Sequence, residues 1–406
     1  MKQTFILPIL IIALACSCKQ QAENHWGTWR GPHANGISNE SDWSAEKLDS
    51  ANICWTRDVG FGHSAASIVG NRLYISGWNE TITETDTVHA STIYCIDTEN
   101  GNDFWTYTYP SEKRNFPGPR STPVIDKDRL YAISWEGMLF CINSKTGEEL
   151  WKTDLTMDSL AQTDQWGFSP SVVVYDDLLL LNFNKSGMAL NKFNGELVWS
   201  SEPLFAGFAS AYIWEQENKA LAVFQSDTSI YFVNPDNGVV ENVHHKQSGY
   251  SIGCDVLALG DTIYATDEAF VYSASGIKSL WHSDSISSYF RTGVVINGYA
   301  YQFSDVRNKF CLNCIDISTG EVLWRESFVR WGALSGINNH LLILTGTGKV
   351  IIAEANPGEY KPIKELQLLS AEDKTENWCW AAPTFFKGKI YVRNSKGELA
   401  CVDLSS

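Results

Sequence analysis

Short apolar runs separated by polar turns recur along the chain, and residues 121–155 contain one complete set of them. Four segments, 121–125, 129–134, 137–142 and 148–152, are each predicted to form a short strand. The turn at 143–147 opens with Asn143 and ends with Gly147, which can adopt the positive φ that other residues resist. These residues therefore predict a four-stranded antiparallel meander.

The turn and the strand after it carry a repeating signature, in which Asp or Asn is followed by Gly four residues later and by Trp four residues after that. The complete copies are Asp97-Gly101-Trp105, Asn143-Gly147-Trp151, Asn191-Gly195-Trp199 and Asp316-Gly320-Trp324. Partial copies lie at Gly238, at Gly276 with Trp281, and at Gly358. Asn242 and Pro362 stand where the other copies have Trp.

The two ends of the chain each carry half a copy, one containing Trp55 and the other ending at Asp403 and Leu404. Together with the other copies they make eight units, spaced by 38 to 50 residues. A single meander cannot cover its own two faces, so radial stacking and ring closure are expected. We predict an all-β fold, an eight-bladed β-propeller of four-stranded antiparallel blades in which an N-terminal strand completes the last blade. Each Trp is expected to wedge between neighbouring blades, with looser contacts at Asn242 and Pro362.

The first 18 residues are predicted to be a lipoprotein signal peptide. Lys2 precedes an apolar run at 5–15, which is too short to span a bilayer, and two cysteines follow. Cys16 is the expected lipidation site, with Cys18 as the alternative, and an ordinary signal peptide is also possible. We therefore divide the chain into a signal peptide (1–18), a tether and lead-in (19–50) and the propeller (51–406), and expect export and lipid anchoring, with the protein in the outer membrane facing the periplasm.

Composition narrows the possible partners. The 406 residues include 16 Trp and carry a net charge of −16. A surface of that sign repels phosphate backbones, which argues against nucleic-acid binding.

The Asp-x-x-x-Gly-x-x-x-Trp signature resembles the repeat of the pyrroloquinoline-quinone-like (PQQ-like) β-propeller family. That family includes quinoprotein dehydrogenases and the BamB lipoproteins of outer-membrane β-barrel assembly. The segment Trp26-Gly-Thr-Trp29-Arg30-Gly31-Pro32 also resembles the lead-in of secreted PQQ-like propellers. The resemblance covers about residues 26–406 and implies a fold more than an activity.

In the family's dehydrogenases, the resemblance implies a disulfide between adjacent cysteines above the quinone, a Trp beneath it, a catalytic Asp and a Ca²⁺ ion. This chain has no adjacent cysteine pair and no acidic run suited to a calcium cage. We assign no catalytic or metal-ligating residue and expect no cofactor. PQQ with calcium belongs only to the alternative, a quinoprotein oxidoreductase.

The residues just before each first strand are predicted to form one rim of the central channel. The candidate ligand-binding residues there are His63, Arg120, Trp166, Phe168, Phe208, Tyr250, Arg291, Trp331, Trp378 and Trp380. Aromatic faces beside guanidinium groups could hold a planar or anionic ligand, a sugar or an extended peptide. The alternative is that these side chains plug the channel. Asp255 is expected either to present its charge there or to pair with Arg291.

The cysteines are mostly expected in the core. Cys95, Cys141, Cys314 and Cys401 share one repeat position that favours a small apolar residue. Cys54 and Cys401 lie on strands expected to be neighbours, which leaves a disulfide between them open. His244 and His245 look exposed, but adjacent strand residues point to opposite faces and do not favour a shared metal.

Three functions remain open at this point. The preferred one is a non-catalytic, membrane-tethered scaffold, monomeric and BamB-like in the broad sense, that binds envelope proteins or a small ligand at the rim. The others are a quinoprotein dehydrogenase and a carbohydrate or small-molecule binder at the channel.

Overall fold

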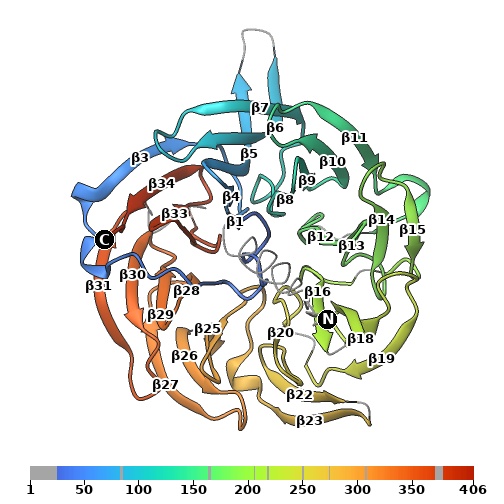
Figure 1. Ribbon diagram of the computed structural model, residues 1–406, viewed down its shortest axis with the longest axis vertical. Helices are drawn as coiled ribbons and strands as arrows, with labels where there is room; N and C mark the ends of the chain where they lie inside the picture. The colour runs from blue at the N-terminus through green and yellow to red at the C-terminus, as the bar shows by residue number, and fades with distance from the viewer. Residues whose placement is uncertain are drawn as a thin grey trace, which may run out of the picture.

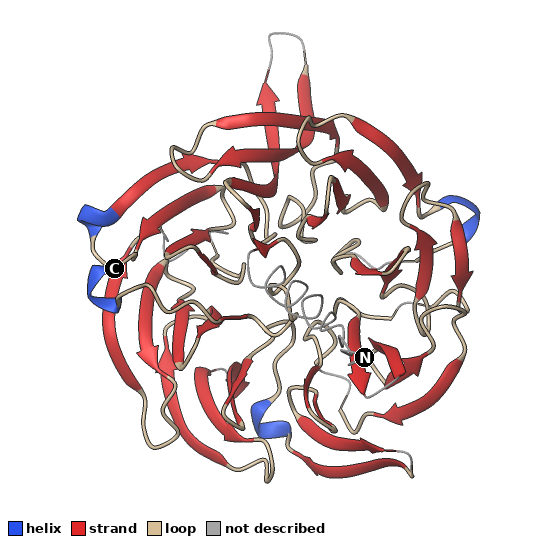
Figure 2. Cartoon of the chain, in the orientation of Figure 1, coloured by secondary structure: helices blue, strands red, loops and turns tan. Residues whose placement is uncertain are grey.

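The computed structural model describes residues 25–82, 86–162, 166–204, 206–216, 219–248, 251–273, 275–306, 309–370 and 378–406. Eight sheets stand around one axis, so the predicted all-β eight-bladed propeller is confirmed (Figure 1). Helical structure in these ranges is limited to four 3-10 turns, η1 (Ala45–Lys47), η2 (Ser50–Asn52), η3 (Met157–Ser159) and η4 (Asp284–Ile286) (Figure 2). No helix in these ranges has the length and hydrophobicity needed to span a bilayer. The lipidation candidates Cys16 and Cys18 lie outside them.

Each blade is an antiparallel meander whose first strand lies innermost. Blade 1 consists of β4 (Ser67–Val69), β5 (Arg72–Ile82), β6 (Thr87–Asp97) and β7 (Asp103–Pro110), and blade 2 of β8 (Val124–Asp126), β9 (Arg129–Ile133), β10 (Met138–Asn143) and β11 (Glu149–Asp154). Blade 3 consists of β12 (Val173–Tyr175), β13 (Leu178–Leu181), β14 (Met188–Asn191) and β15 (Leu197–Ser200), and blade 4 of β16 (Tyr212–Gln216), β17 (Lys219–Gln225), β18 (Ser229–Val233) and β19 (Val240–His245).

Blades 5 to 8 repeat the pattern. Blade 5 consists of β20 (Leu257–Leu259), β21 (Thr262–Tyr264), β22 (Glu268–Ser273) and β23 (Gly276–His282), and blade 6 of β24 (Val294–Ile296), β25 (Tyr299–Val306), β26 (Lys309–Asp316) and β27 (Val322–Phe328). Blade 7 consists of β28 (Ala333–Ile337), β29 (His340–Leu344), β30 (Lys349–Glu354) and β31 (Lys361–Gln367), and blade 8 of β32 (Thr384–Phe386), β33 (Lys389–Arg393), β34 (Glu398–Asp403) and β3 (Ile53–Asp58). β3 pairs antiparallel with β34, which confirms that an N-terminal strand completes the last blade.

The alternation of strand directions gives the ring two distinct faces. The turns between first and second strands and between third and fourth strands lie on one side, here called the turn face. The loops that lead into the first strands lie on the other side, here called the rim face. The four strands predicted from residues 121–155 correspond to β8 to β11.

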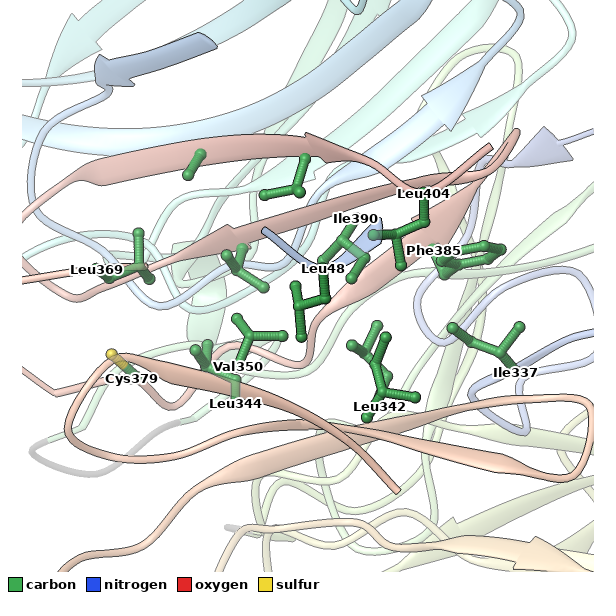
Figure 3. Close-up of a cluster of buried hydrophobic side chains, with 14 residues drawn as sticks. Leu48, Ile337, Leu342, Leu344, Val350, Leu369, Cys379, Phe385, Ile390 and Leu404 are labelled. Atoms are coloured by element: carbon green, nitrogen blue, oxygen red, sulfur yellow. The ribbon is translucent and has the colours of Figure 1, made fainter. Parts of the chain in front are cut away.

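The lead-in before β3 is built into the propeller. β1 (His25–Trp26) adds antiparallel to β4, and β2 (Ile37–Ser38) adds parallel to β28, so blades 1 and 7 become five-stranded. Leu48, with 1% of its surface exposed, packs between blades 7 and 8 among Leu342, Val350 and Ile390 (Figure 3). Residues 25–50 thus contribute to the same core as the blades.

The signature Trp of one blade packs on the signature Gly of the next. An added Cβ at Gly101 would lie 2.9 Å from the Trp55 ring, and one at Gly147 would lie 2.8 Å from Trp105. Five of the six signature indole nitrogens also donate to carbonyls of the next blade's turn, and that of Trp151 is buried without a partner. These bonds are Trp55 Nε1 to Thr98 O (3.0 Å), Trp105 to Ser144 (3.0 Å), Trp199 to Pro235 (2.7 Å), Trp281 to Ile317 (2.6 Å) and Trp324 to Asn356 (2.8 Å). The signature therefore builds the contact between blades.

Replacing Gly101 with alanine tests this packing. Gly101 has a φ of +75°, and Gly70 has a φ of +66° with nothing within 4 Å of an added Cβ. We expect Gly70→Ala to cost about 1 kcal/mol from backbone strain alone. Gly101→Ala should cost about 2 kcal/mol, because the methyl group also displaces Trp55. Chemical denaturation of both variants measures the difference, and equal costs would contradict the packing role of Trp55.

The repeat cysteines are buried as expected. Cys95, Cys141, Cys314 and Cys401 are all 0% exposed, and Cys54 is exposed. Cys54 and Cys401 are both free thiols in this structure.

Candidate functional site

Short polar side chains link the first strands around the channel. In blades 1 to 5, the residue two positions before the first strand donates its backbone N–H to the side chain at the matching position of the next blade. The bonds run from Ala65 to Thr122 Oγ1 (3.0 Å), Thr122 to Ser171 Oγ (2.9 Å), Ser171 to Ser210 Oγ (3.0 Å), Ser210 to Asp255 Oδ1 (2.8 Å) and Asp255 to Thr292 Oγ1 (2.8 Å). This belt joins blades 1 to 6 and holds the loops of the rim face in place.

On the rim face, aromatic side chains from different blades meet around Trp380. Their ring centroids lie close to that of Trp380, at 5.1 Å for His63, 5.2 Å for Phe290, 5.3 Å for Trp378, 5.8 Å for Phe116 and 6.3 Å for Trp331. His63 is stacked on Trp380, with an angle of 28° between the two rings. Phe116 also contacts Trp166, at 5.8 Å. We call these seven residues the aromatic rim.

Arginines lie against the rings of this face. Arg330 lies 4.6 Å from the Trp378 ring, and Arg291 lies 4.7 Å from the Trp331 ring. Arg291 also forms an ion pair with Asp305 at 2.7 Å, and Asp305 accepts a hydrogen bond from Trp331 Nε1. Arg120 and Arg114 lie over Trp135, at 4.7 and 4.9 Å. The rim therefore joins cationic groups to aromatic faces in a chain whose net charge is −16.

The rim histidine is neutral. Burial holds the pKa of His63 well below its ordinary value, and the charges of Arg120 and Arg393 lower it further. The indole nitrogens (Nε1) of Trp378 and Trp380 are buried without a hydrogen-bond partner. Unpaired buried donors of this kind are costly, so the rim retains unused capacity to donate hydrogen bonds.

Beneath the rim, two residues of the lead-in, Trp29 and Arg30, lie in the channel. Trp29 Nε1 donates to Asp255 Oδ2 at 2.7 Å, and Arg30 donates to the carbonyls of Thr292, Gly293 and Asn35. Burial lowers the pKa of Arg30 to about 10, and burial raises the pKa of Asp255 while the Arg30 charge opposes that rise. The space left between this plug and the rim is a cavity of about 30 Å³.

The predicted rim residues other than Phe168 fall into three groups. His63, Trp166, Trp331, Trp378 and Trp380 belong to the aromatic rim. Phe208 contacts Tyr289 at 6.4 Å, and Arg120 and Arg291 lie against other rings as described. Tyr250 lies outside the described residues.

Placing Phe168 on the rim was wrong. Its side chain is 1% exposed and packs edge-on against Phe183 at 4.8 Å in the core between blades 2 and 3. The expected pairing of Asp255 with Arg291 was also wrong, because the Asp255 carboxylate accepts hydrogen bonds from Trp29, Ser210 and Thr292, and the cation that influences its pKa is Arg30. Arg291 pairs with Asp305 instead.

Phe116, Phe290, Arg114 and Arg330 were missed by the sequence analysis. Phe290 and Arg330 each directly precede a predicted rim residue, which was a usable signal. Phe116 and Arg114 lie in the loop before Arg120, and spacing does not indicate where such a loop points.

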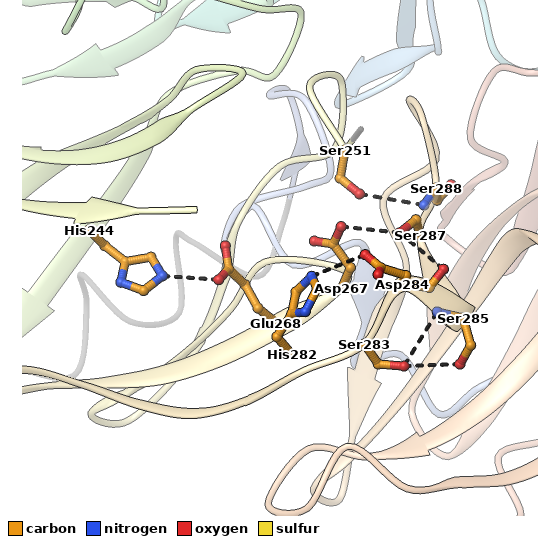
Figure 4. Close-up of polar contacts among 10 residues, drawn as sticks. All are labelled: His244, Ser251, Asp267, Glu268, His282, Ser283, Asp284, Ser285, Ser287 and Ser288. Carbon is orange, nitrogen blue, oxygen red and sulfur yellow. Dashed lines mark hydrogen bonds and ion pairs between the residues drawn. The ribbon is translucent and has the colours of Figure 1, made fainter. Parts of the chain in front are cut away.

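A second polar cluster lies at the junction of blades 4 and 5 (Figure 4). His244 Nε2 lies 3.0 Å from Glu268 Oε2, and the imidazole stacks on Phe270 at 4.0 Å. His244 is only 9% exposed, so its apparent exposure in the sequence was misleading. Burial raises the pKa of Asp267, and the Lys246 charge opposes the shift. Within the described ranges, no group of three or more His, Cys, Asp or Glu side chains is placed to hold a metal ion.

Comparison with known proteins identifies the family. The family model described as outer membrane protein assembly factor BamB matches residues 89–301, which is more than half of the chain. The chain belongs to this BamB family. Tetrathionate hydrolase of Acidithiobacillus ferrooxidans is 27% identical over 108 residues, 26% of this chain and 19% of that protein. BamB of Moranella endobia is 22% identical over 272 residues, 66% of this chain and 60% of that protein. The chain therefore covers less than two thirds of either relative.

Solved structures share the propeller of the BamB family. Quinohemoprotein alcohol dehydrogenase from Comamonas testosteroni superimposes with a TM-score of 0.69 at 14% identity, covering 94% of this chain and 81% of that one. BamB from Moraxella catarrhalis gives a TM-score of 0.61 at 12% identity, covering 86% and 99%. At these identities the likeness shows the fold alone.

The dehydrogenase likeness raises the question of whether this BamB-family chain could hold a quinone. Below the rim, Trp29 and Arg30 bound a cavity of about 30 Å³, which suits one water molecule. Larger cavities of about 650 and 1110 Å³ lie between the first strands toward the turn face, on the far side from the rim. Above the small cavity, the aromatic rings pack against one another. The chain has no adjacent cysteine pair to cover a quinone. The residues of this channel mouth therefore do not fit PQQ.

Proposed function

We propose that this protein is a non-catalytic scaffold of the cell envelope that binds partner proteins through its aromatic rim and the arginines on it. One observation carries the proposal, which is that seven aromatic rings from several blades close the channel mouth into a platform instead of lining a pocket. Trp and Arg are the side chains most enriched at the energetic centres of protein interfaces.

The shape of this mouth favours a protein partner over a small molecule. Small-molecule sites are concave and typically enclose about 300–1,000 Å³. The cavity beneath the rim is about 30 Å³, which is too small for a sugar ring. A protein surface needs no such cavity, because it can cover the rings from outside.

The tethering part of the proposal rests on the sequence and on the family. The apolar run at 5–15 followed by Cys16 and Cys18 suits a lipid anchor. The family is described as an outer membrane protein assembly factor. We propose that the chain is anchored to the outer membrane and faces the periplasm, where it holds assembly partners.

Site-specific photo-cross-linking tests where partners bind. A cross-linking amino acid placed at Phe208, on the rim face, should capture a defined envelope protein in cells. The same amino acid at Phe193, an exposed residue of the signature turn on the turn face, should not capture it. Capture of the same protein from Phe193 alone would refute a rim interface.

Removing the central ring should weaken that interaction. We expect Trp380→Ala to reduce the affinity for the captured partner about 30-fold, roughly 2 kcal/mol, as for the central residue of an interface. Titration of the purified partner with each variant measures the change. Phe193→Ala removes an aromatic ring on the turn face and should leave the affinity unchanged. An unchanged affinity in a correctly folded Trp380→Ala variant would contradict the proposal, and Trp378→Ala provides a second variant at the same platform.

A further inference from the structure

The ring-closing blade carries two cysteines at one β-bulge. In the pairing of β3 with β34, Ile53 lies opposite Val402 and Trp55 lies opposite Cys401. The register shift between these pairs means that Cys54 and Trp55 both oppose Cys401. Opposed residues of antiparallel strands have Cα atoms about 4.5–5.5 Å apart, which is within the 4.4–6.8 Å range of disulfides.

The same bulge recurs in other blades with a different side chain. Cys95, Cys141 and Cys314 each pair with the signature Trp, and the register shifts at the same place. The residues corresponding to Cys54 are Phe104, Leu150 and Leu323, which are 41%, 42% and 38% exposed. Three blades thus place one cysteine beside a large apolar side chain, and the closing blade places two cysteines together.

The surroundings give the two thiols different accessibility. Cys54 is exposed and Cys401 is fully buried. Burial raises the pKa of Cys401, and the neighbouring Cys54 thiol raises it further, whereas the Lys389 charge lowers it. Lys389 forms an ion pair with Glu99 of blade 1 at 2.9 Å, so a cation is held near both sulfurs at the junction of the closing blade with blade 1.

We propose that Cys54 and Cys401 form a disulfide when an external disulfide oxidises them. This bond locks β3, which precedes the blades in the chain, to β34, which lies at the end of the chain. The exposed Cys54 thiolate attacks one sulfur of the external disulfide, which forms a mixed disulfide and releases one thiolate. Cys401 then loses its proton and attacks the Cys54 sulfur, which releases the second thiolate. Overall, the two protein thiols lose two protons and two electrons, and the external disulfide is reduced to two thiols.

The location of this pair gives the bond a large structural consequence. It joins strands at opposite ends of the propeller sequence, β3 and β34, which hold the ring closed. A cross-link that closes a long loop restricts the unfolded chain most strongly. It also prevents β3 from separating from the closing blade. The proposal is independent of the partner-binding function of the rim.

Oxidation of the purified protein with oxidised glutathione tests the proposal. After free thiols are alkylated, peptide mapping should show one cross-linked peptide joining Cys54 to Cys401, with the loss of two hydrogen atoms. The midpoint of thermal unfolding should move to higher temperature, and dithiothreitol should reverse the shift. Alkylation of both thiols after oxidation, or a stable glutathione adduct on Cys54, would overturn the proposal.

Two variants separate the geometry from other effects of oxidation. Cys54→Ser removes an exposed thiol and should abolish both the cross-link and the thermal shift. In that background, Leu150→Cys places a second cysteine at the matching bulge of blade 2, beside Cys141. It should regain a disulfide, now between positions 150 and 141, if the bulge geometry brings the two sulfurs together. A cross-link in neither pair would refute the geometric basis of the proposal.

Discussion

Replacing Arg393 with methionine is expected to destabilise the propeller by about 3 kcal/mol, because the side chain joins the closing blade to blade 1. Arg393 is 2% exposed, and it donates to Ser76 O at 2.7 Å, Gly60 O at 2.7 Å and Asn394 O at 3.2 Å. Methionine fills similar space but leaves Gly60 O without a donor, at about 1–3 kcal/mol. Ser76 O keeps only the weaker bond from Ser64 Oγ (3.2 Å), and Asn394 O keeps only the bond from the Gly397 N–H (3.3 Å). Removal of a buried charge offsets part of that cost.

Chemical denaturation measures this loss, and hydrogen exchange locates it. Exchange should increase first at the junction of blades 8 and 1. Arg72→Met is the matched control, since Arg72 is only partly buried and lies 4.0 Å from the Phe104 ring. That variant should cost less than about 1 kcal/mol. A similar stability for both variants would show that Arg393 does not hold this junction.

Replacing Asp255 with leucine is expected to cost about 3–5 kcal/mol, because three groups lose their buried acceptor and the buried Arg30 loses the favourable influence of this carboxylate. Asp255 is 7% exposed and accepts hydrogen bonds from Trp29 Nε1 and from the Ser210 backbone N–H, both of which would lose their acceptor. The lead-in should also detach from the channel. Limited proteolysis between residues 25 and 50 reports that detachment, and chemical denaturation reports the free energy of unfolding.

A double variant distinguishes loss of charge balance from loss of packing. If the Arg30 charge is the main cost, Arg30→Met in the Asp255→Leu background should recover part of the lost stability, because neither buried charge remains. Additive losses in the double variant would mean that the two residues stabilise the channel separately.

The strands and turns of the fold were predictable because their signals are local. Gly147 marks a positive φ, and Asn143 opens the same turn, whatever the rest of the chain does. Four complete copies, three partial copies and the two half copies at the chain ends together determine the blade count. The segments that contain Trp55 and Asp403 were recognisable as two halves of one blade. The first lacks the start of the repeat, and the second lacks its end.

The rim was only partly predictable, because loop residues have no fixed side-chain direction. Trp331, Trp378 and Trp380 were found because each lies in a loop that leads into a first strand, β28 or β32. Phe168 occupies the corresponding position in blade 3, but its loop turns the ring toward Phe183 and into the core. The path of an irregular loop depends on its neighbours, so spacing could not distinguish these cases.

The sequence by itself determined the eight-bladed ring and its closure, because strand alternation and turn glycines act over a few residues. Only the tertiary structure decided what fills the channel and what faces the rim. The bond from Trp29 to Asp255 spans 226 residues, and Arg393 reaches Ser76 O only across the junction where the ring closes. Such contacts carry no local signal, because chain closure creates them and no residue pattern near either partner requires them.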